Sequence, residues 1–344
     1  MSDSILTIQN LSVSFKTPQG EVQAVRDVSL DVKPGEVLCV VGESGCGKTV
    51  MCKSVMKLLP KNGYIKSGRI IVDGNDITDY KEKQMRAIRG SLFSMVFQDP
   101  MTTLNPTIPI GKQITEAIKK HEKITTEEAH ARTVELLDMV GISDPEERYK
   151  LQPHFFSGGM RQRCVLAVAL ASYPKLLFAD EATTALDVTV EEKILKLLLD
   201  VKEKMNISMV FITHDLGAVA RIADRVAVMY AGKIVEIGTA EEVFYDPRHP
   251  YTWGLLSSLP ALAKKGGDLK SIPGMPPSLL DPPPWDAFAE RNDYAMAIDY
   301  EKEPPMFKVS DTHSAATWLL DERAPMVTPP IILKERRGLW KQIQ

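Results

Sequence analysis

Alternating and continuous runs of apolar residues predict strands along much of the chain. Apolar and polar residues alternate loosely over 5–15 and again over 22–32, which predicts two N-terminal antiparallel strands joined by a turn at 17–20. Four later runs are mainly apolar, as is typical of strands that are buried on both faces of a parallel sheet. These four runs span residues 37–41, 92–97, 176–179 and 209–213.

Helical spacing of apolar residues separates these runs. It begins after residue 47, covers most of 107–173 and returns over 188–204. Strands that alternate with helices predict an α/β fold around a mostly parallel sheet, with a helical subdomain of about 99–173 inserted into it. From about residue 240, prolines crowd a segment of weak periodicity. We therefore expect a core domain over 1–240 and a loop-rich C-terminal extension over 241–344.

The composition is that of a folded globular protein, and it narrows the function classes. Of 344 residues, 44% are apolar and 25% are charged, which excludes disordered and fibrous chains. The net charge of −3 provides no overall basic field, so we expect no nucleic-acid partner. No run of about 18 apolar residues is present, so no membrane-spanning helix is expected. The four cysteines have neither a disulfide-framework nor a zinc-site spacing.

A glycine-rich segment predicts a phosphate-binding loop. Residues 42–49 match G-x-x-x-x-G-K-[ST] between a predicted buried strand and a predicted helix. Glycines let successive backbone N–H groups point at phosphate oxygens, and the helix N-terminus adds positive potential. The alternative, a glycine-rich turn with a chance lysine, does not explain the flanking strand and helix. The predicted phosphate-binding residues are Gly42, Glu43, Ser44, Gly45, Cys46, Gly47, Lys48, Thr49 and Val50.

Two further polar clusters support nucleotide chemistry. Asp180 and Glu181 follow a buried strand, where the first carboxylate can hold Mg²⁺ and the second can act as a general base toward water. Ser157 precedes two glycines at the start of a predicted helix, which provides a second anion site. Taken alone, the acidic pair is better explained as a polar end of a strand, and the serine with its glycines as an ordinary helix cap. With one phosphate loop in the chain, two half-sites indicate a head-to-tail dimer in which each subunit completes the other's ATP site.

Together these residues resemble the ATP-binding subunits of ABC transporters, over roughly the first 240 residues. The resemblance implies the fold of a P-loop NTPase with an inserted helical subdomain. Six motifs follow one another in the family's order. They are Walker A at 42–49, the Q-loop at Gln98, the signature at 156–162, Walker B with its glutamate at 176–181, the D-loop at 185–187 and the switch histidine His214.

The resemblance implies a role for each motif residue. Phe15 would stack on adenine, although an ordinary core phenylalanine is the alternative. The residues expected near Mg²⁺ are Thr49, Gln98 and Asp180, and the expected catalytic residues are Glu181, His214 and Gln98. The residues expected to act on ATP held by a second subunit are Ser157, Gly158, Gly159, Met160 and Gln162, together with Asp187 of the D-loop. One departure is Ala182, where the family usually has proline.

The C-terminal extension indicates a subfamily. Residues 249–256 and 271–278 resemble the tail of oligopeptide, dipeptide and nickel importer ATPases, and Phe156 at the start of the signature favours the peptide branch. Many members of that branch carry four tail cysteines suited to an iron–sulfur cluster. The positions that align with those cysteines hold Asp286, Asn292, Asp299 and Thr317. Because such clusters require thiolate ligands, we expect no iron–sulfur cluster in this tail.

The function implied by the resemblance is ATP hydrolysis that powers peptide import. ATP and Mg²⁺ would be the ligands, and ATP would close a dimer with a second ATPase subunit, which we expect to be a related chain. Two membrane permease subunits would hold this chain at the cytoplasmic face of the membrane, and an external substrate-binding protein would complete the transporter.

Three alternatives stay open at this point. The first is a soluble ABC-type ATPase of DNA repair or translation, which the short helical insertion and the single phosphate loop disfavour. The second is a motor for nickel or another solute. The third is a regulatory binder that does not hydrolyse ATP, which the presence of both Glu181 and His214 disfavours.

Overall fold

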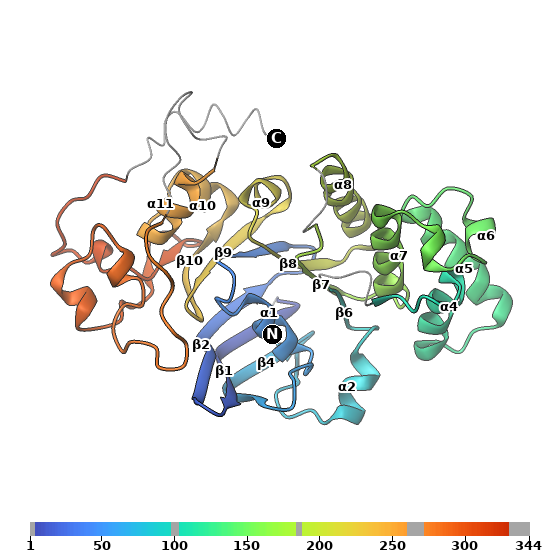
Figure 1. Ribbon diagram of the computed structural model, residues 1–344, viewed down its shortest axis with the longest axis horizontal. Coiled ribbons are helices and arrows are strands. Elements are labelled where there is room, and N and C mark those ends of the chain that lie inside the picture. Colours follow the sequence, from blue (N-terminus) through green and yellow to red (C-terminus); the bar gives the residue numbers. More distant parts are fainter. Residues whose placement is uncertain (1–3, 98–102, 184–187, 260–271, 330–344) are drawn as a thin grey trace. The chain divides into compact units, whose positions relative to one another are not determined.

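A computed structural model describes residues 4–97, 103–183, 188–259 and 272–329 (Figure 1). The chain divides into two compact units. The first unit comprises Met1–Leu6, Asp31–Val37 and Ile71–Ile212. The second unit comprises Thr7–Leu30, Leu38–Ile70 and Thr213–Gln344. Each unit is therefore assembled from segments that lie far apart in the sequence.

Parallel strands form the centre of the first unit. They are β6 (Phe93–Val96), β7 (Leu176–Asp180) and β8 (Ser208–Thr213). β7 pairs with both neighbours, and every residue of the three strands is buried. Their nearly continuous apolar sequences follow from this burial on both faces. The three strands predicted from these runs are confirmed, with ends that differ by one or two residues.

Helices make up most of the rest of the first unit. They are α2 (Glu82–Ile88), α4 (Ile110–His121), α5 (Thr126–Met139), α6 (Pro145–Arg148), α7 (Gly158–Leu170) and α8 (Val188–Met205), with the 3₁₀ turn η1 (Pro153–Phe155). Ile110, Ile114 and Ile118 line the buried face of α4, and α4, α5 and α7 pack on one another (Figure 1). Thr125 starts α5 by accepting a hydrogen bond from the Glu128 N–H in a capping box. The predicted helical insertion is confirmed.

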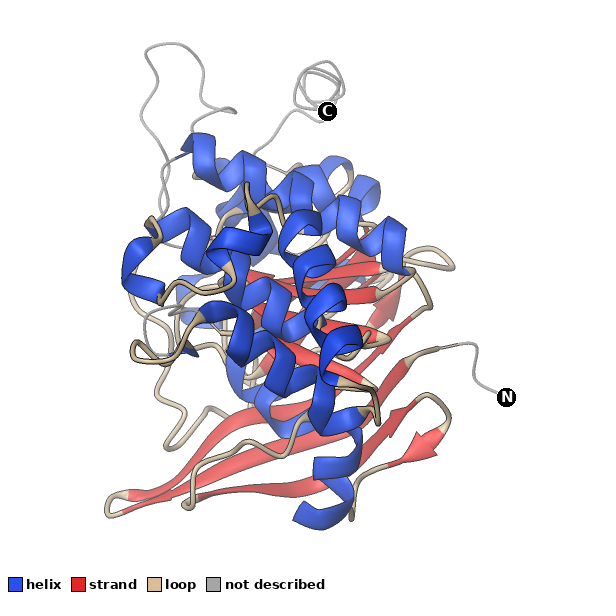
Figure 2. Ribbon diagram, turned by 90° about the vertical axis from the view of Figure 1, so that its right-hand side faces the viewer, coloured by secondary structure: helices blue, strands red, loops and turns tan. Residues whose placement is uncertain are grey.

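An antiparallel sheet contributes to the second unit. Its strands β2 (Gly20–Val32), β1 (Leu6–Thr17) and β4 (Gly63–Val72) lie in that order, and the short β5 (Asn75–Asp76) pairs with the end of β4. The long strands are the long red ribbons in the lower part of Figure 2. The sequence analysis missed β4, because only two of its ten residues are buried and its apolar signal is weak.

A mixed sheet carries the C-terminal half of the second unit. β3 (Val37–Val41) runs parallel to β9 (Arg225–Tyr230), and β10 (Lys233–Thr239) pairs antiparallel with β9. β12 (Ser314–Ala315) then adds to β10, and β11 (Phe307–Lys308) adds to β12. The C-terminal extension was expected to be rich in loops, and it also extends this sheet.

The helices of the second unit are mostly short. They are α1 (Lys48–Val55), α9 (Leu216–Ile222), α10 (Ala240–Tyr245), α11 (Pro250–Ser257) and the 3₁₀ turns η3 (Ala289–Arg291), η4 (Ala297–Tyr300) and η5 (Trp318–Leu320). Among the residues that the structure describes, no helix is both long enough and apolar enough to cross a membrane.

Candidate nucleotide-binding site

The loop of residues 42–49 connects the buried strand β3 to helix α1, as predicted. Gly42 and Gly47 have φ angles of 151° and 107°, which disfavour any other residue. A Cβ atom at Gly42 would lie 2.1 Å from the backbone oxygen of Met229, and one at Gly47 would lie 2.3 Å from that of Ala24. The two glycines are therefore required both by backbone conformation and by close packing. Gly45 has open space around it but a φ of 80°.

Lys48 is buried inside this loop. Its Nζ donates hydrogen bonds to the carbonyl oxygens of Gly42 (2.7 Å) and Glu43 (2.9 Å), and it lies 3.6 Å from Sγ of Cys46. The ammonium group is thus held at the N-terminus of α1, where positive potential favours an anion. Burial raises the pKa of the Cys46 thiol, and the smaller opposing effect of Lys48, through its charge and hydrogen bonds, lowers it. The thiol is therefore neutral beside the Lys48 amino group.

The C-terminal region contacts the second residue of the loop. The backbone N–H of Glu43 donates to the hydroxyl of Tyr251, at 2.9 Å. The guanidinium of Arg291 donates two hydrogen bonds to the Glu43 carboxylate, at 2.8 and 2.9 Å. Sequence reasoning missed both contacts. The segment that contains Tyr251 was interpreted only as a subfamily marker, and an isolated arginine in a proline-rich tail carries no signal of its own.

Phe15 and His214 belong to the same unit as the loop. Phe15 is half-buried on β1, and its ring packs so closely on Gly63 that a Cβ atom there would lie 2.7 Å from it. His214 is exposed directly after β8. The next residue, Asp215, caps α9 by accepting a hydrogen bond from the Gly217 N–H. The roles expected for Phe15 in adenine stacking and for His214 in phosphate binding stay predictions.

The acidic pair lies at the end of β7 in the first unit. Asp180 is its last residue and is only 4% exposed. Glu181 follows with a φ of 49°, and its N–H donates to the Ile212 carbonyl of the neighbouring strand, at 2.9 Å. The chain therefore turns sharply at Glu181 and leaves its side chain partly exposed. Ala182, where proline was expected from the resemblance, is buried.

The serine–glycine segment forms the start of α7, also in the first unit. Ser157 is the N-cap and accepts a hydrogen bond from the Met160 N–H, at 3.4 Å. Ser157 and Gly158 are exposed, whereas Gln162 is buried. The N-terminus of this 13-residue helix carries the positive end of the helix dipole, which favours an anion, and the predicted role of these residues stays a prediction. Gln98 and Asp187 lie outside the described residues.

A buried carboxyl pair occupies the C-terminal region. Asp286, Asn292, Asp299 and Thr317 are all buried. The Asp286 side chain is hydrogen bonded to that of Asp299. Burial, and then the charge of Asp299, raise the pKa of Asp286 to about 7. Among the described residues, no group of three or more histidine, cysteine, aspartate or glutamate side chains is arranged to hold a metal ion.

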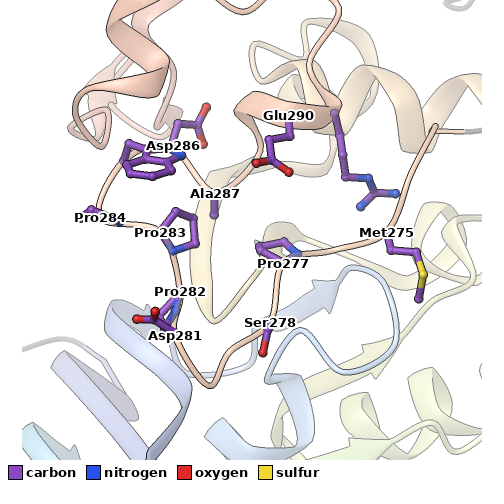
Figure 3. Close-up of a pocket in the computed structure, with 12 residues that line it drawn as sticks. Met275, Pro277, Ser278, Asp281, Pro282, Pro283, Pro284, Asp286, Ala287 and Glu290 are labelled. Carbon is purple, nitrogen blue, oxygen red and sulfur yellow. The ribbon is translucent and has the colours of Figure 1, made fainter.

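A cavity of about 370 Å³ lies beside this pair (Figure 3). All its lining residues belong to the segment 275–291 of the C-terminal region. The lining residues include Asp281, Asp286, Glu290 and Arg291. The same arginine that pairs with Glu43 therefore forms part of the cavity wall.

Known proteins match almost the whole chain. The family described as ABC transporter matches residues 25–184, and the family described as oligopeptide/dipeptide transporter, C-terminal region, matches residues 235–298. The oligopeptide transport ATP-binding protein OppD of Bacillus subtilis is 58% identical, over 96% of this chain and 93% of its own. The dipeptide transport ATP-binding protein DppD of Lactococcus lactis is 52% identical, over 99% of this chain and 98% of its own.

Solved structures agree with this assignment of the fold. The ATP-binding cassette MJ0796, in a dimeric post-hydrolysis state bound to ADP and Pi, is 26% identical with a TM-score of 0.61. The match covers 68% of this chain and 98% of that one. CbiO1 from Clostridium perfringens, part of an ABC transporter complex, is 28% identical with a TM-score of 0.62, over 71% of this chain and 92% of that one.

Proposed function

The chain belongs to the ATP-binding subunits of oligopeptide and dipeptide ABC transporters. We propose that its phosphate loop binds ATP and that Glu181 acts as the base in the hydrolysis that powers peptide import. The observation that carries the proposal is the Lys48 ammonium, held inside a glycine loop at the N-terminus of α1. This arrangement is a preformed site for the β- and γ-phosphates of a nucleotide.

ATP binding uses the phosphate loop, one aromatic ring and three oxygen donors for Mg²⁺. Lys48 exchanges its bonds to the loop carbonyls for phosphate oxygens, and the N–H groups of residues 45–50 bind the remaining ones. Phe15 stacks on adenine through the exposed part of its ring. Thr49 and Asp180 provide a hydroxyl and a carboxylate, the hard oxygen donors that suit Mg²⁺, and Gln98 adds an amide oxygen. Bound Mg²⁺ would neutralise phosphate charge.

Hydrolysis uses the carboxylate of Glu181 as the general base. Glu181 accepts a proton from water as the water oxygen attacks the γ-phosphorus, the bond to the bridging oxygen breaks, and ADP leaves with its electron pair. The sharp turn at Glu181 holds this carboxylate beyond the end of β7. His214 donates a hydrogen bond to the γ-phosphate and so stabilises the charge that is transferred.

A second ATPase subunit completes each ATP site in this proposal. The exposed N-terminus of α7, with Ser157 and Gly158, contacts the γ-phosphate of ATP that is bound to the other subunit. Asp187 of the D-loop lies at the same interface. Closure on ATP and opening after hydrolysis then drive two permease subunits, which hold this chain at the cytoplasmic face of the membrane. A substrate-binding protein outside delivers peptide, and the second ATPase is a related chain.

Replacement of the base tests this proposal. Glu181→Gln keeps the size of the side chain but removes the base, so steady-state ATP turnover should fall at least 100-fold, at the low end of typical general-base contributions. ATP-dependent association with a second ATPase subunit should persist, and the complex should accumulate. Glu203→Gln, an equivalent change at an exposed position on α8, is the control. Unchanged turnover in Glu181→Gln would contradict the assignment of the base.

A further inference from the structure

The second residue of the phosphate loop is fixed through all its polar groups. The Glu43 carboxylate accepts two hydrogen bonds from Arg291, and its N–H donates to Tyr251. Its carbonyl accepts hydrogen bonds from Nζ of Lys48 and, at 3.3 Å, from the N–H of Cys46. The first turn of the loop is therefore held from two sides, by Lys48 within the loop and by the C-terminal region outside it.

Arg291 is built into its position rather than resting on the surface. Its side chain is 6% exposed, and its other donors are also used: Nε donates to the Pro273 carbonyl at 2.7 Å and Nη1 to the Tyr230 hydroxyl at 3.2 Å. Burial opposes the charge of Arg291, but its hydrogen bonds to Glu43 and Tyr230 raise its pKa above the ordinary value. A bidentate pair between planar groups fixes orientation as well as distance.

Three aromatic rings support this contact. The ring centroids of Tyr230 and Tyr251 are 4.6 Å apart, and Phe288 packs edge-on against both, at 5.2 and 5.4 Å. Burial raises the pKa of Tyr251, so its hydroxyl stays neutral and can accept the Glu43 N–H. The two hydroxyl groups that bond Arg291 and Glu43 therefore belong to one packed cluster.

We propose that Arg291 is a positioning residue of the ATP site, and that through Glu43 the C-terminal region sets the affinity of the phosphate loop for ATP. Both Tyr251 and Arg291 lie in the stretch that matches the C-terminal family and outside the stretch that matches the ABC transporter family. This inference rests on the proposed function and adds a determinant of nucleotide affinity that the ATPase motifs do not contain.

The physical reason is competition for Lys48. Phosphate binding takes the ammonium group away from the carbonyls of Gly42 and Glu43, so the loop loses its internal support when the ligand arrives. The Arg291–Glu43 pair and the Tyr251 hydroxyl stay in place and keep the N–H groups of the loop aimed at phosphate. Without them the loop must be reordered on binding, which weakens affinity but leaves the base and the γ-phosphate contacts unchanged.

The test compares variants for equilibrium binding of a fluorescent ATP analogue with Mg²⁺ and for KM and kcat of hydrolysis. Arg291→Ala should raise Kd and KM roughly tenfold, the size of one lost charge-assisted hydrogen bond, and should change kcat by less than about twofold. Arg291→Lys, which keeps one charged donor, should lie between Arg291→Ala and wild type. Arg323→Ala removes an exposed arginine that pairs with Asp321 in the same region and is the matched control.

Glu43→Gln keeps the inference testable if Arg291→Ala does not fold, because the side chain of Glu43 is 26% exposed and its size is unchanged. It should also raise Kd, and the double variant with Arg291→Ala should be no weaker than Arg291→Ala alone, because both remove one interaction. Unchanged Kd in Glu43→Gln, or full additivity of the two changes, would overturn the inference while wild-type turnover still supports the proposed function. Wild-type protein that binds no ATP would overturn both.

Discussion

The carboxyl pair in the C-terminal region predicts a pH-dependent stability that one substitution should remove. Asp286 is buried beside Asp299, and its Oδ1 accepts the Phe288 N–H at 2.9 Å. In its protonated form Asp286 can also donate to the carboxylate of Asp299. Asp286→Asn keeps both interactions, because an amide oxygen can accept from Phe288 and an amide N–H can donate to Asp299. The substitution removes only the charge that Asp286 must carry at high pH.

The size of the effect follows from the pKa of Asp286. This pKa is about 7 in the folded chain against 3.8 for an ordinary aspartate. Between these values the folded chain holds a proton that the unfolded chain releases, so the contribution to stability is complete below 3.8 and is lost as pH rises through 7. About three units at 1.36 kcal/mol each correspond to roughly 4 kcal/mol. The free energy of unfolding of Asp286→Asn should therefore exceed that of wild type by up to about 4 kcal/mol at pH 8, and by almost nothing at pH 4.

Urea unfolding followed by tryptophan fluorescence measures this difference, since Trp285 adjoins Asp286 in the chain. Wild type and variant are compared at pH 4, 5, 6, 7 and 8. Asp293→Asn, an equivalent change at an exposed position seven residues away, should leave the free energy of unfolding unchanged at every pH. A difference between Asp286→Asn and wild type that stays constant with pH would refute the reasoning, because it would mean that Asp286 titrates normally in the folded chain.

Two further predictions concern buried groups of the second unit. Burial lowers the pKa of His249 from 6.5 to about 3, so the free energy of unfolding should fall as pH drops below 6.5, by about 2 kcal/mol at pH 5. Urea unfolding of His249→Asn, which retains a helix-capping side chain, should show no such dependence on pH. An equal dependence in the two proteins would contradict the lowered pKa of His249. Gly42→Ala would place a Cβ atom 2.1 Å from the Met229 backbone oxygen and should abolish ATP binding. In Gly45→Ala the new Cβ atom meets no atom within 4 Å, so this variant should lose only about 1–2 kcal/mol of stability through backbone strain. ATP-binding and melting measurements on both variants separate the two effects, and equal losses of ATP affinity in the two variants would count against a steric role for Gly42.

The fold was predictable wherever local sequence and burial agree. The parallel strands β6, β7 and β8 are buried on both faces, so their apolar runs identify them without any tertiary information. β4 is the opposite case, because most of its residues are partly or fully exposed. The short strand β12 has two residues, and its place beside β10 depends on contacts between distant segments. No periodicity can appear in so short a segment.

For the candidate site, only the local conformation of the phosphate loop could be predicted from the sequence. The phosphate loop is specified locally, since its glycines are fixed by φ angles and close packing within a few residues of Lys48. The partners of Glu43 are separated from it by more than 200 residues, and the sequence gives no hint of the pairing. The roles of all the motif residues, Gln98 and Asp187 included, stay predictions.

The position of Arg291 bears on how the C-terminal extension should be regarded. β9 ends at Tyr230, whose hydroxyl accepts from Arg291, and β9 pairs with β3, which leads into the phosphate loop. The extension also reaches this sheet at β10, where β12 pairs with the edge of β10 that β9 does not use. Removal of residues after 240 would therefore leave an edge of β10 unpaired and would take away both outer partners of Glu43. The boundary near residue 240 stays a prediction, but these contacts join the extension to the loop of residues 42–49, as the proposed role of Arg291 requires.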